Sequence, residues 1–232
     1  LLAATGCTPE QLQDLLFDTY LVRLNAEPAE VVTTVNNIAT VFEIEPIHVF
    51  ELATQGFSVD LPIGVADEIA SWDEVRYVVI DNPDTYTPPP DFDEPELGDG
   101  EEPEGITRIG GSVTSVDFSG VGVAIIDTGI DLDHPDLNVA GGVDIVGQAG
   151  GSDNDGDDGH GHGTHVAGTI GAIADGEGVA GVAPGIDVYA VRVLDDNGSG
   201  TYGDIIAGLE WVLTQDDIRV VNMSLGGGGD PA

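Results

Sequence analysis

The residues best suited to chemistry gather in one short segment, residues 158–170, which reads DGHGHGTHVAGTI. Three of the five histidines of the chain, His160, His162 and His165, fall within six positions of this segment. Imidazole is a common metal ligand, and it is also the side chain whose proton affinity best suits acid–base catalysis near neutral pH. The segment therefore predicts either a metal site or a catalytic base.

The spacing of these histidines does not suit a zinc site. Helical zinc motifs place two histidines four residues apart around a glutamate, or add cysteines and carboxylates at fixed offsets. His162 and His165 are three residues apart, and no glutamate lies between them. Gly161 and Gly163 instead remove side chains on both sides of His162, which would let a peptide main chain approach its imidazole. This pattern favours a single proton-transfer base.

Asp127 is the carboxylate that could orient this base. It ends the apolar run VGVAIID, residues 121–127, which is typical of a parallel strand buried on both faces. In open α/β sheets, functional sites form beyond the carboxyl ends of the strands. A histidine at a helix start beside such a carboxylate is the base half of a Ser-His-Asp arrangement. The alternative is that Asp127 is only a turn residue or a helix cap.

The segments around these residues alternate between strands and helices, which predicts an α/β fold with a parallel sheet. Further strands are expected at residues 186–194 and 218–225, and helices at residues 162–174 and 202–213.

The first part of the chain has a different order of elements. Alternating runs and helical spacing of apolar residues predict the order β-α-β-β-α-β, typical of a small α+β domain with a split βαβ (ferredoxin-like) fold. The strands are expected at residues 19–25, 47–54, 57–62 and 75–81, and the helices at 28–42 and 65–72.

Charge and composition exclude several classes of protein. The chain has 43 acidic and five basic residues and a formal net charge of −38, so it has no basic patch that could bind nucleic acid. The acids are spread among apolar segments, which favours a solvated carboxylate surface suited to high salt. No apolar run of 20 residues predicts a membrane span, and the single cysteine, Cys7, excludes an intrachain disulfide.

The opening residues, LLAATGC, resemble the end of a signal peptide. Their ending also resembles a bacterial lipoprotein cleavage box, in which Cys7 would carry the lipid, although Ala4 stands where leucine is usual. We therefore expect an exported, secreted or extracellular protein, either anchored to the cell surface through Cys7 or carrying an ordinary thiol there.

Four motifs together resemble the subtilisin-like (subtilase, S8) serine proteases. They are AIIDTGIDLDHPDL at 124–137, GHGTHVAGTI at 161–170, GVAPGIDVYAVRVLDDNGSG at 181–200 and VNMSLGGG at 221–228. The resemblance covers residues 106–232 and implies part of a parallel-sheet subtilisin-like catalytic domain, whose substrates are peptides and proteins. The preceding β-α-β-β-α-β segment resembles the inhibitory propeptide of the family (I9 type), which would occupy the cleft through a strand near residues 77–81 and act as an intramolecular inhibitor.

The resemblance assigns roles to individual residues. Asp127 would fix the tautomer of His162, and His162 would be the general base and acid, whereas His165 would support the fold and His160 would lie in a variable loop. The substrate main chain would pair with two segments, and Tyr202 would either wall a distal subsite or be an ordinary exposed aromatic at a helix start. The first of these segments contains Ser199 and Gly200, and the second contains Ser224, Leu225 and Gly226.

The resemblance also implies a structural calcium ion. Its ligands would be Asp136 and Asp175 together with the backbone carbonyls of Ile173, Glu177 and Val179, although the family usually has asparagine where Asp175 stands. The acidic run SDNDGDDGH, residues 152–160, is either a second site with oxygen ligands or a solvated loop.

The nucleophile of the family lies in a GTSxA motif, which these 232 residues do not contain. Ser224 belongs to a substrate segment, so we expect the nucleophile to lie outside this sequence, the sequence to be part of a longer zymogen, and this piece alone to be inactive. Two alternatives are a catalytically inactive subtilase-like module that binds peptide or calcium, and a metal-binding His/Asp protein. The expected layout is a signal or lipobox remnant with a short helix at 1–18, the propeptide domain at 19–82, an acidic, proline-rich linker at 83–105 and the partial catalytic domain at 106–232.

Overall fold

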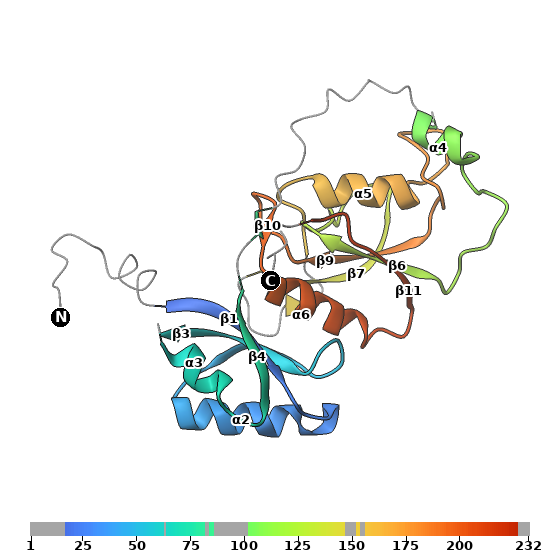
Figure 1. Cartoon of the computed structure of the whole chain (residues 1–232). Coiled ribbons are helices and arrows are strands. Elements are labelled where there is room, and N and C mark those ends of the chain that lie inside the picture. Colours follow the sequence, from blue (N-terminus) through green and yellow to red (C-terminus); the bar gives the residue numbers. More distant parts are fainter. Residues whose placement is uncertain are drawn as a thin grey trace, which may run out of the picture. The chain divides into compact units, whose positions relative to one another are not determined.

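The computed structural model divides the chain into two compact units, Leu1–Asn82 and Pro83–Ala232, which we describe separately (Figure 1). It describes residues 17–62, 64–81, 84–85, 102–146, 152–153 and 156–226. The predictions for Cys7, for the helix within residues 1–16 and for most of the linker concern residues outside these ranges. Among the helices described, none has the length and apolar character needed to cross a membrane.

The first unit is a four-stranded antiparallel sheet with two helices on one face. The strand order is β2-β3-β1-β4, and the chain follows the order β-α-β-β-α-β that the sequence predicts. Apolar residues of both helices pack with one face of the sheet in a single core, because Val31, Val35 and Ile38 recur at helical spacing. The elements are β1 (Phe17–Leu24), the 3-10 helix η1 (Pro28–Glu30), α2 (Val31–Phe42), β2 (Pro46–Phe50), β3 (Gly56–Pro62), α3 (Val65–Ala70) and β4 (Val75–Ile80).

The second unit contains the parallel sheet that the sequence predicts. Its strand order is β11-β6-β9-β7-β8, in which the first four strands are parallel and β8 is antiparallel to β7. The strands are β6 (Gly122–Asp127), β7 (Asn138–Asp144), β8 (Ser152–Asp153), β9 (Asp187–Arg192) and β11 (Ile218–Asn222), and the helices are α4 (Glu104–Ile109), α5 (His162–Gly171) and α6 (Tyr202–Val212).

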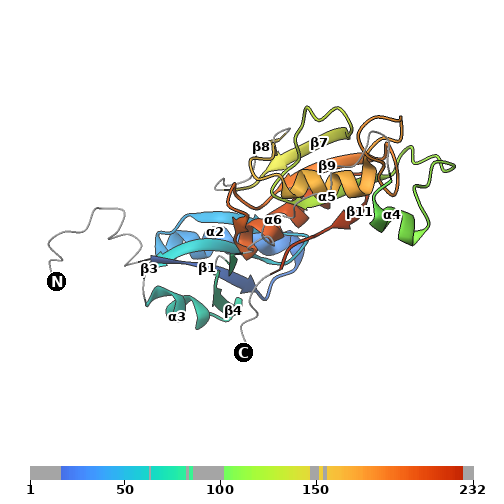
Figure 2. The ribbon, with the colours of Figure 1, turned by 90° about the horizontal axis from the view of Figure 1, so that it is seen from above.

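Helices α5 and α6 cover opposite faces of this sheet (Figure 1). Successive residues of β6 point to opposite faces, so Val123 and Ile125 belong to the core beneath α5, whereas Ala124 and Ile126 belong to the core beneath α6. Figure 2 shows α5 running alongside β9. A strand covered on both faces must be apolar at every position, which explains the uninterrupted run that ends in Asp127.

The second unit also contains a separate, short two-stranded ladder. Strand β5 (Asp84–Thr85) pairs antiparallel with β10 (Ser199–Gly200), with Ser199 opposite Thr85 and Gly200 opposite Asp84. Both strands belong to the second unit.

Several elements differ from the expectation: strand β5 lies inside the segment expected to be a linker, and β2 and β11 end earlier than expected, at Phe50 and Asn222. Strand β7 carries Gly141 and Gly142, which weaken a strand pattern in the sequence, and α4 begins inside the segment expected to be an extended linker. Helix α5 ends at Gly171, before the expected residue 174.

Candidate active site

The parallel strands bring several of the predicted site residues to one edge of the sheet. Asp127 is the last residue of β6, which lies between β9 and β11. Ser199 and Gly200 follow β9 in the chain, and the segment 224–226 follows β11. Because the carboxyl ends of parallel strands share one edge, Asp127 is flanked by the two segments expected to bind substrate.

Helix α5 starts at His162, close to the end of β6. A Cβ atom built at Gly163 would lie 2.0 Å from the carbonyl oxygen of Gly129 and 3.2 Å from Cβ of Asp127. Gly161 has a φ of 99°, in the left-handed region, and no atom would lie within 4 Å of a Cβ at this position. Gly163 therefore permits close packing of helix and loop, so the expectation that it clears space for a substrate was wrong, whereas Gly161 does have open space around it.

The structure brings Asp127 and His162 into direct contact. Nδ1 of His162 lies 2.7 Å from Oδ1 of Asp127, and the backbone N–H of Thr128 donates to the same oxygen at 2.7 Å. The Asp127 side chain is fully buried, whereas that of His162 is 17% exposed. Because an ionised carboxylate can only accept hydrogen bonds, this contact assigns the proton to Nδ1 and leaves Nε2 as the basic nitrogen of neutral His162.

Burial dominates the electrostatics of Asp127. Removal from water raises the pKa of this carboxyl above its ordinary value, although the hydrogen bonds from His162 and Thr128 oppose the shift. Its second oxygen, Oδ2, is buried and has no hydrogen-bond partner among the described residues. The carboxylate thus depends strongly on the contacts made by Oδ1.

The other histidines of the motif region occupy different positions. Nδ1 of His160 accepts a hydrogen bond from the backbone N–H of His162 at 3.3 Å, and the two rings meet edge to face at 6.4 Å. His165 lies on the exposed side of α5. No group of three or more His, Cys, Asp or Glu side chains suited to a metal ion occurs within the described part of the chain.

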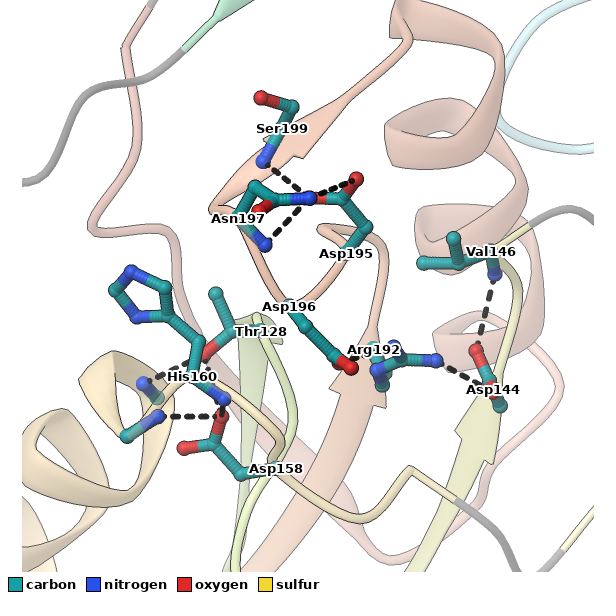
Figure 3. Close-up of polar contacts among 12 residues, drawn as sticks. Thr128, Asp144, Val146, Asp158, His160, Arg192, Asp195, Asp196, Asn197 and Ser199 are labelled. Carbon is teal, nitrogen blue, oxygen red and sulfur yellow. Dashed lines mark hydrogen bonds and ion pairs between the residues drawn. The ribbon is translucent and has the colours of Figure 1, made fainter.

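A tight turn and a helix cap hold the first segment expected to bind substrate. Oδ1 of Asp195 accepts hydrogen bonds from the backbone N–H groups of Asn197 and Ser199, both at 2.9 Å (Figure 3). Thr201 then forms a capping box with Asp204 at the start of α6. Tyr202, the first residue of that helix, is 40% exposed.

The second segment expected to bind substrate leaves the sheet after Asn222. The side-chain amide of Asn222 donates to Oγ of Ser224 at 2.9 Å. Leu225 packs at the margin of the core beneath α6, and Gly226 is exposed. The expected strand 218–225 is therefore regular only as far as Asn222.

The residues expected to bind calcium form a loop around Asp136. Its carboxylate accepts hydrogen bonds from the backbone N–H groups of Ile173 at 3.1 Å and Val179 at 3.3 Å. Asp175 and Glu177 lie between these two residues, and Oδ1 of Asp175 accepts from the N–H of Glu177. The two carboxylates and three carbonyls are all oxygen donors, the type that Ca²⁺ prefers, so the residues present fit this ion.

The acidic run before the histidines is described only in part. Oδ1 of Asp157 accepts a weak hydrogen bond from the backbone N–H of Leu132 at 3.4 Å. The side chains of Asp153 and Asp155, the other candidate ligands of a second site, lie outside the described residues.

Sequence reasoning did not single out Asp158 and Arg192, which both form several polar contacts near the site (Figure 3). The one sequence signal for Asp158 is its type, since an acidic residue just ahead of a helix often caps its first turn. Arg192 ends a buried strand, and that position alone does not predict its partners.

Comparisons with known proteins match the same part of the chain. Residues 119–232 match the family model of the subtilase family. Subtilisin DY from Bacillus licheniformis is 54% identical over 107 residues, which are 46% of this chain and 37% of that protein. Subtilisin E from Bacillus subtilis (strain 168) is 54% identical over 109 residues, which are 47% of this chain and 28% of that protein. Subtilisin Savinase from Lederbergia lenta is 46% identical over 127 residues, which are 53% of this chain and 45% of that protein.

The chain thus spans less than half the length of each of these three relatives. The matched region contains the Asp127–His162 contact and both segments expected to bind substrate. Residues 119–232, just under half of the chain, are thus similar to the subtilase family along their whole length.

Proposed function

We propose that this chain belongs to a secreted serine endopeptidase precursor in which Asp127 and His162 are the first two members of a catalytic triad. The observation that supports this most directly is the 2.7 Å contact between Nδ1 of His162 and the buried carboxylate of Asp127, within the region that matches the subtilase family.

The contact suits His162 to general base and acid catalysis. Asp127 holds the proton on Nδ1, so Nε2 takes the proton from a serine hydroxyl as its oxygen bonds to the scissile carbonyl carbon. The same proton then passes to the leaving amine as the C–N bond breaks, and a water molecule reverses the steps to release the acid. In this proposal the serine and the groups that stabilise the oxyanion lie outside residues 1–232.

The antiparallel pairing of β10 supports the proposed mode of substrate binding. Ser199 and Gly200 already pair with the extended segment Asp84–Thr85, so their backbone can accept an added strand. We propose that residues 19–82 form the inhibitory propeptide. In this proposal the segment that occupies the cleft is the tail after the propeptide, which contains residues 84–85, and not the strand near residues 77–81 that the sequence suggests.

Calcium would stabilise the loop around Asp136 in this proposal. Asp136 and Asp175 would supply carboxylate oxygens, while Ile173, Glu177 and Val179 would supply carbonyl oxygens. A bound Ca²⁺ would neutralise part of the charge of the two carboxylates in a protein that already carries a formal net charge of −38.

Export is the remaining part of the proposal. It is supported by the resemblance of residues 1–7 to the end of a signal peptide, with Cys7 as the point of lipid attachment if the precursor is anchored.

The test is expression of the complete gene, followed by an assay of casein hydrolysis with and without a serine-directed inhibitor. We expect inhibitor-sensitive hydrolysis that is lost in His162→Ala and retained in His165→Ala, whose histidine lies on the exposed side of α5. Activity that resists the inhibitor, or that survives His162→Ala, would overturn the proposal. A well-folded product that binds peptides and cleaves none would favour the inactive module instead.

A further inference from the structure

Asp158 is the centre of a hydrogen-bond network immediately before the proposed catalytic histidine (Figure 3). Its Oδ1 accepts from the backbone N–H groups of His160 at 2.9 Å and Gly161 at 2.8 Å. Its Oδ2 accepts from the backbone N–H of Thr164 at 2.9 Å and from the hydroxyl of the same residue at 2.6 Å. One carboxylate therefore fixes the backbone on both sides of His162.

Thr128 connects this network to the end of β6. The hydroxyl of Thr128 donates to Oδ1 of Asp158 at 2.9 Å and accepts from the backbone N–H of Gly163 at 3.0 Å. The backbone N–H of Thr128 donates to the same Asp127 oxygen that contacts His162. Thr128 is thus bonded to the carboxylate of the pair and to the helix start that carries the imidazole.

The network requires a group that only accepts hydrogen bonds. Oδ1 of Asp158 receives three hydrogen bonds and Oδ2 receives two, so an amide at this position would place an NH₂ donor against N–H and O–H donors. Burial raises the pKa of Asp158, but the hydrogen bonds from Thr164, Gly161 and His160 together outweigh it and hold the pKa below its ordinary value. The carboxylate is therefore charged under the conditions in which a subtilase would work.

We propose that Asp158, acting through Thr128 and the first turn of α5, is a positioning residue that sets the contact between the imidazole of His162 and the carboxylate of Asp127. The five hydrogen bonds of the Asp158 carboxylate go to backbone N–H groups and to threonine hydroxyls. It fixes the two backbone segments from which they project, so its loss leaves the pair present but misaligned. The catalytic consequence rests on the proposed function, whereas the geometric one does not.

The experiment uses this 232-residue chain labelled with ¹⁵N-histidine. Proton and nitrogen NMR identify the His162 Nδ1–H proton that is bonded to Asp127, report the tautomer of the ring and give the rate at which this proton exchanges with water. Two variants disturb the network, one with a change of charge (Asp158→Asn) and one without (Thr128→Val). Two matched controls are Asp157→Asn, which removes the adjacent exposed carboxylate, and Thr128→Ser, which keeps the hydroxyl.

We expect the Nδ1 proton to exchange about tenfold faster, or more, in Asp158→Asn and in Thr128→Val. This factor corresponds to the free energy of about one lost hydrogen bond. Both controls should stay within about twofold of the unmodified chain. If Asp158→Asn does not fold, Thr128→Val and Thr128→Ser carry the comparison alone. Exchange and tautomer that are unchanged in both network variants, with only a lower melting temperature, would show that Asp158 merely stabilises the helix start and would overturn the proposal.

These outcomes are independent of peptide hydrolysis. If the complete gene product cleaves no peptide while the NMR result is as expected, the proposed function fails and the positioning role remains. If the product cleaves casein but the NMR signals do not change between the variants, the positioning role fails and the proposed function remains.

Discussion

Arg192 and Asp144 face each other across β9 and β7, where they are register partners joined by an ion pair of 2.7 Å. The two side chains are 16% and 14% exposed. Arg192 also contacts Asp196 at 2.8 Å, but that carboxylate is 66% exposed. Arg192 therefore has one sheltered partner and one that is largely in water.

This difference predicts unequal effects of two matched substitutions. Asp144→Asn should lower the free energy of unfolding by about 2 kcal/mol or more, because it leaves a sheltered guanidinium without its main partner. Asp196→Asn should lower it by less than about 1 kcal/mol, as expected for an exposed ion pair. Urea denaturation of each variant measures both values, and equal losses would contradict the prediction.

Two glycines of α5 should respond in opposite directions to replacement by alanine. Gly163→Ala should destabilise the fold strongly, by about 2 kcal/mol or more, because its Cβ would lie 2.0 Å from the carbonyl oxygen of Gly129. Gly168→Ala places its Cβ in open space within the same helix and should stabilise by about 0.5–1 kcal/mol. Thermal denaturation of the pair gives the comparison, and a well-tolerated Gly163→Ala would mean that the helix start can shift.

Asp127→Asn should raise the melting temperature (Tm) at pH 7 even though it removes the proposed catalytic carboxylate. The pKa of Asp127 is raised in the folded chain mainly by burial, so folding favours its protonated form and loses stability as the pH rises through that pKa. Asparagine cannot ionise and avoids this loss.

The gain should be present at pH 7, where Asp127 is ionised in the unfolded chain. It should shrink as the pH falls below about 4, where Asp127 is protonated in both states. Asp157→Asn, which removes an exposed charge, is the control. A Tm of Asp127→Asn below that of the unmodified chain at pH 7 would mean that the contact with His162 outweighs the burial of the charge.

Calcium should stabilise the chain through Asp136. Adding Ca²⁺ after removal of divalent ions with a chelator should raise Tm, with a contribution of about 2.7 kcal/mol when its concentration is 100 times Kd. Asp136→Asn should abolish the shift, whereas Asp133→Asn, at an exposed position nearby, should keep it. Calorimetry with Ca²⁺ and with Zn²⁺ decides the matter, because a larger shift with Zn²⁺ would support the metal-binding His/Asp protein instead.

Salt should stabilise the chain at neutral pH. The formal net charge of −38 means that the carboxylates repel one another in the folded chain, and salt screens this repulsion. Raising NaCl from 0.1 to 1 M shortens the screening length from about 10 Å to about 3 Å. We expect Tm to rise across this range at pH 7 and to change much less near pH 4, where many carboxylates are protonated. A Tm that is equally sensitive to salt at both pH values would point to a cause other than carboxylate repulsion.

The sequence predicts the parallel sheet well where strands are buried on both faces. Strand β6 has no polar side chain before Asp127, and β9 is apolar or aromatic between Asp187 and Arg192, which is the composition that a strand covered by α5 and α6 needs. Strand β7 could not be predicted, because Gly141 and Gly142 interrupt the apolar pattern of a strand. It forms by pairing with β9, which lies more than 40 residues later in the sequence.

The candidate site shows the same division. Asp127 and His162 could be predicted because one ends a strand and the other begins a helix, and the structure brings them into contact. The link between Asp158 and Thr128 could not be predicted, because the hydrogen bonds of the Thr128 hydroxyl to Asp158 and to Gly163 join segments 30 or more residues apart and depend on how these segments fold together. The expectation for Gly163 failed for the same reason, since the atom that restricts it belongs to Gly129.

The ladder between β5 and β10 joins two backbones, each through only two residues. A contact of this kind is indifferent to most side chains but sensitive to the main-chain N–H itself. Exchanging Asp84 or Thr85 for almost any other residue should therefore leave the ladder in place. Pairs alternate along an antiparallel ladder, so proline should weaken it only at whichever of the two positions donates its N–H to β10, and an N-methylated amide there in a peptide that competes for β10 should do the same.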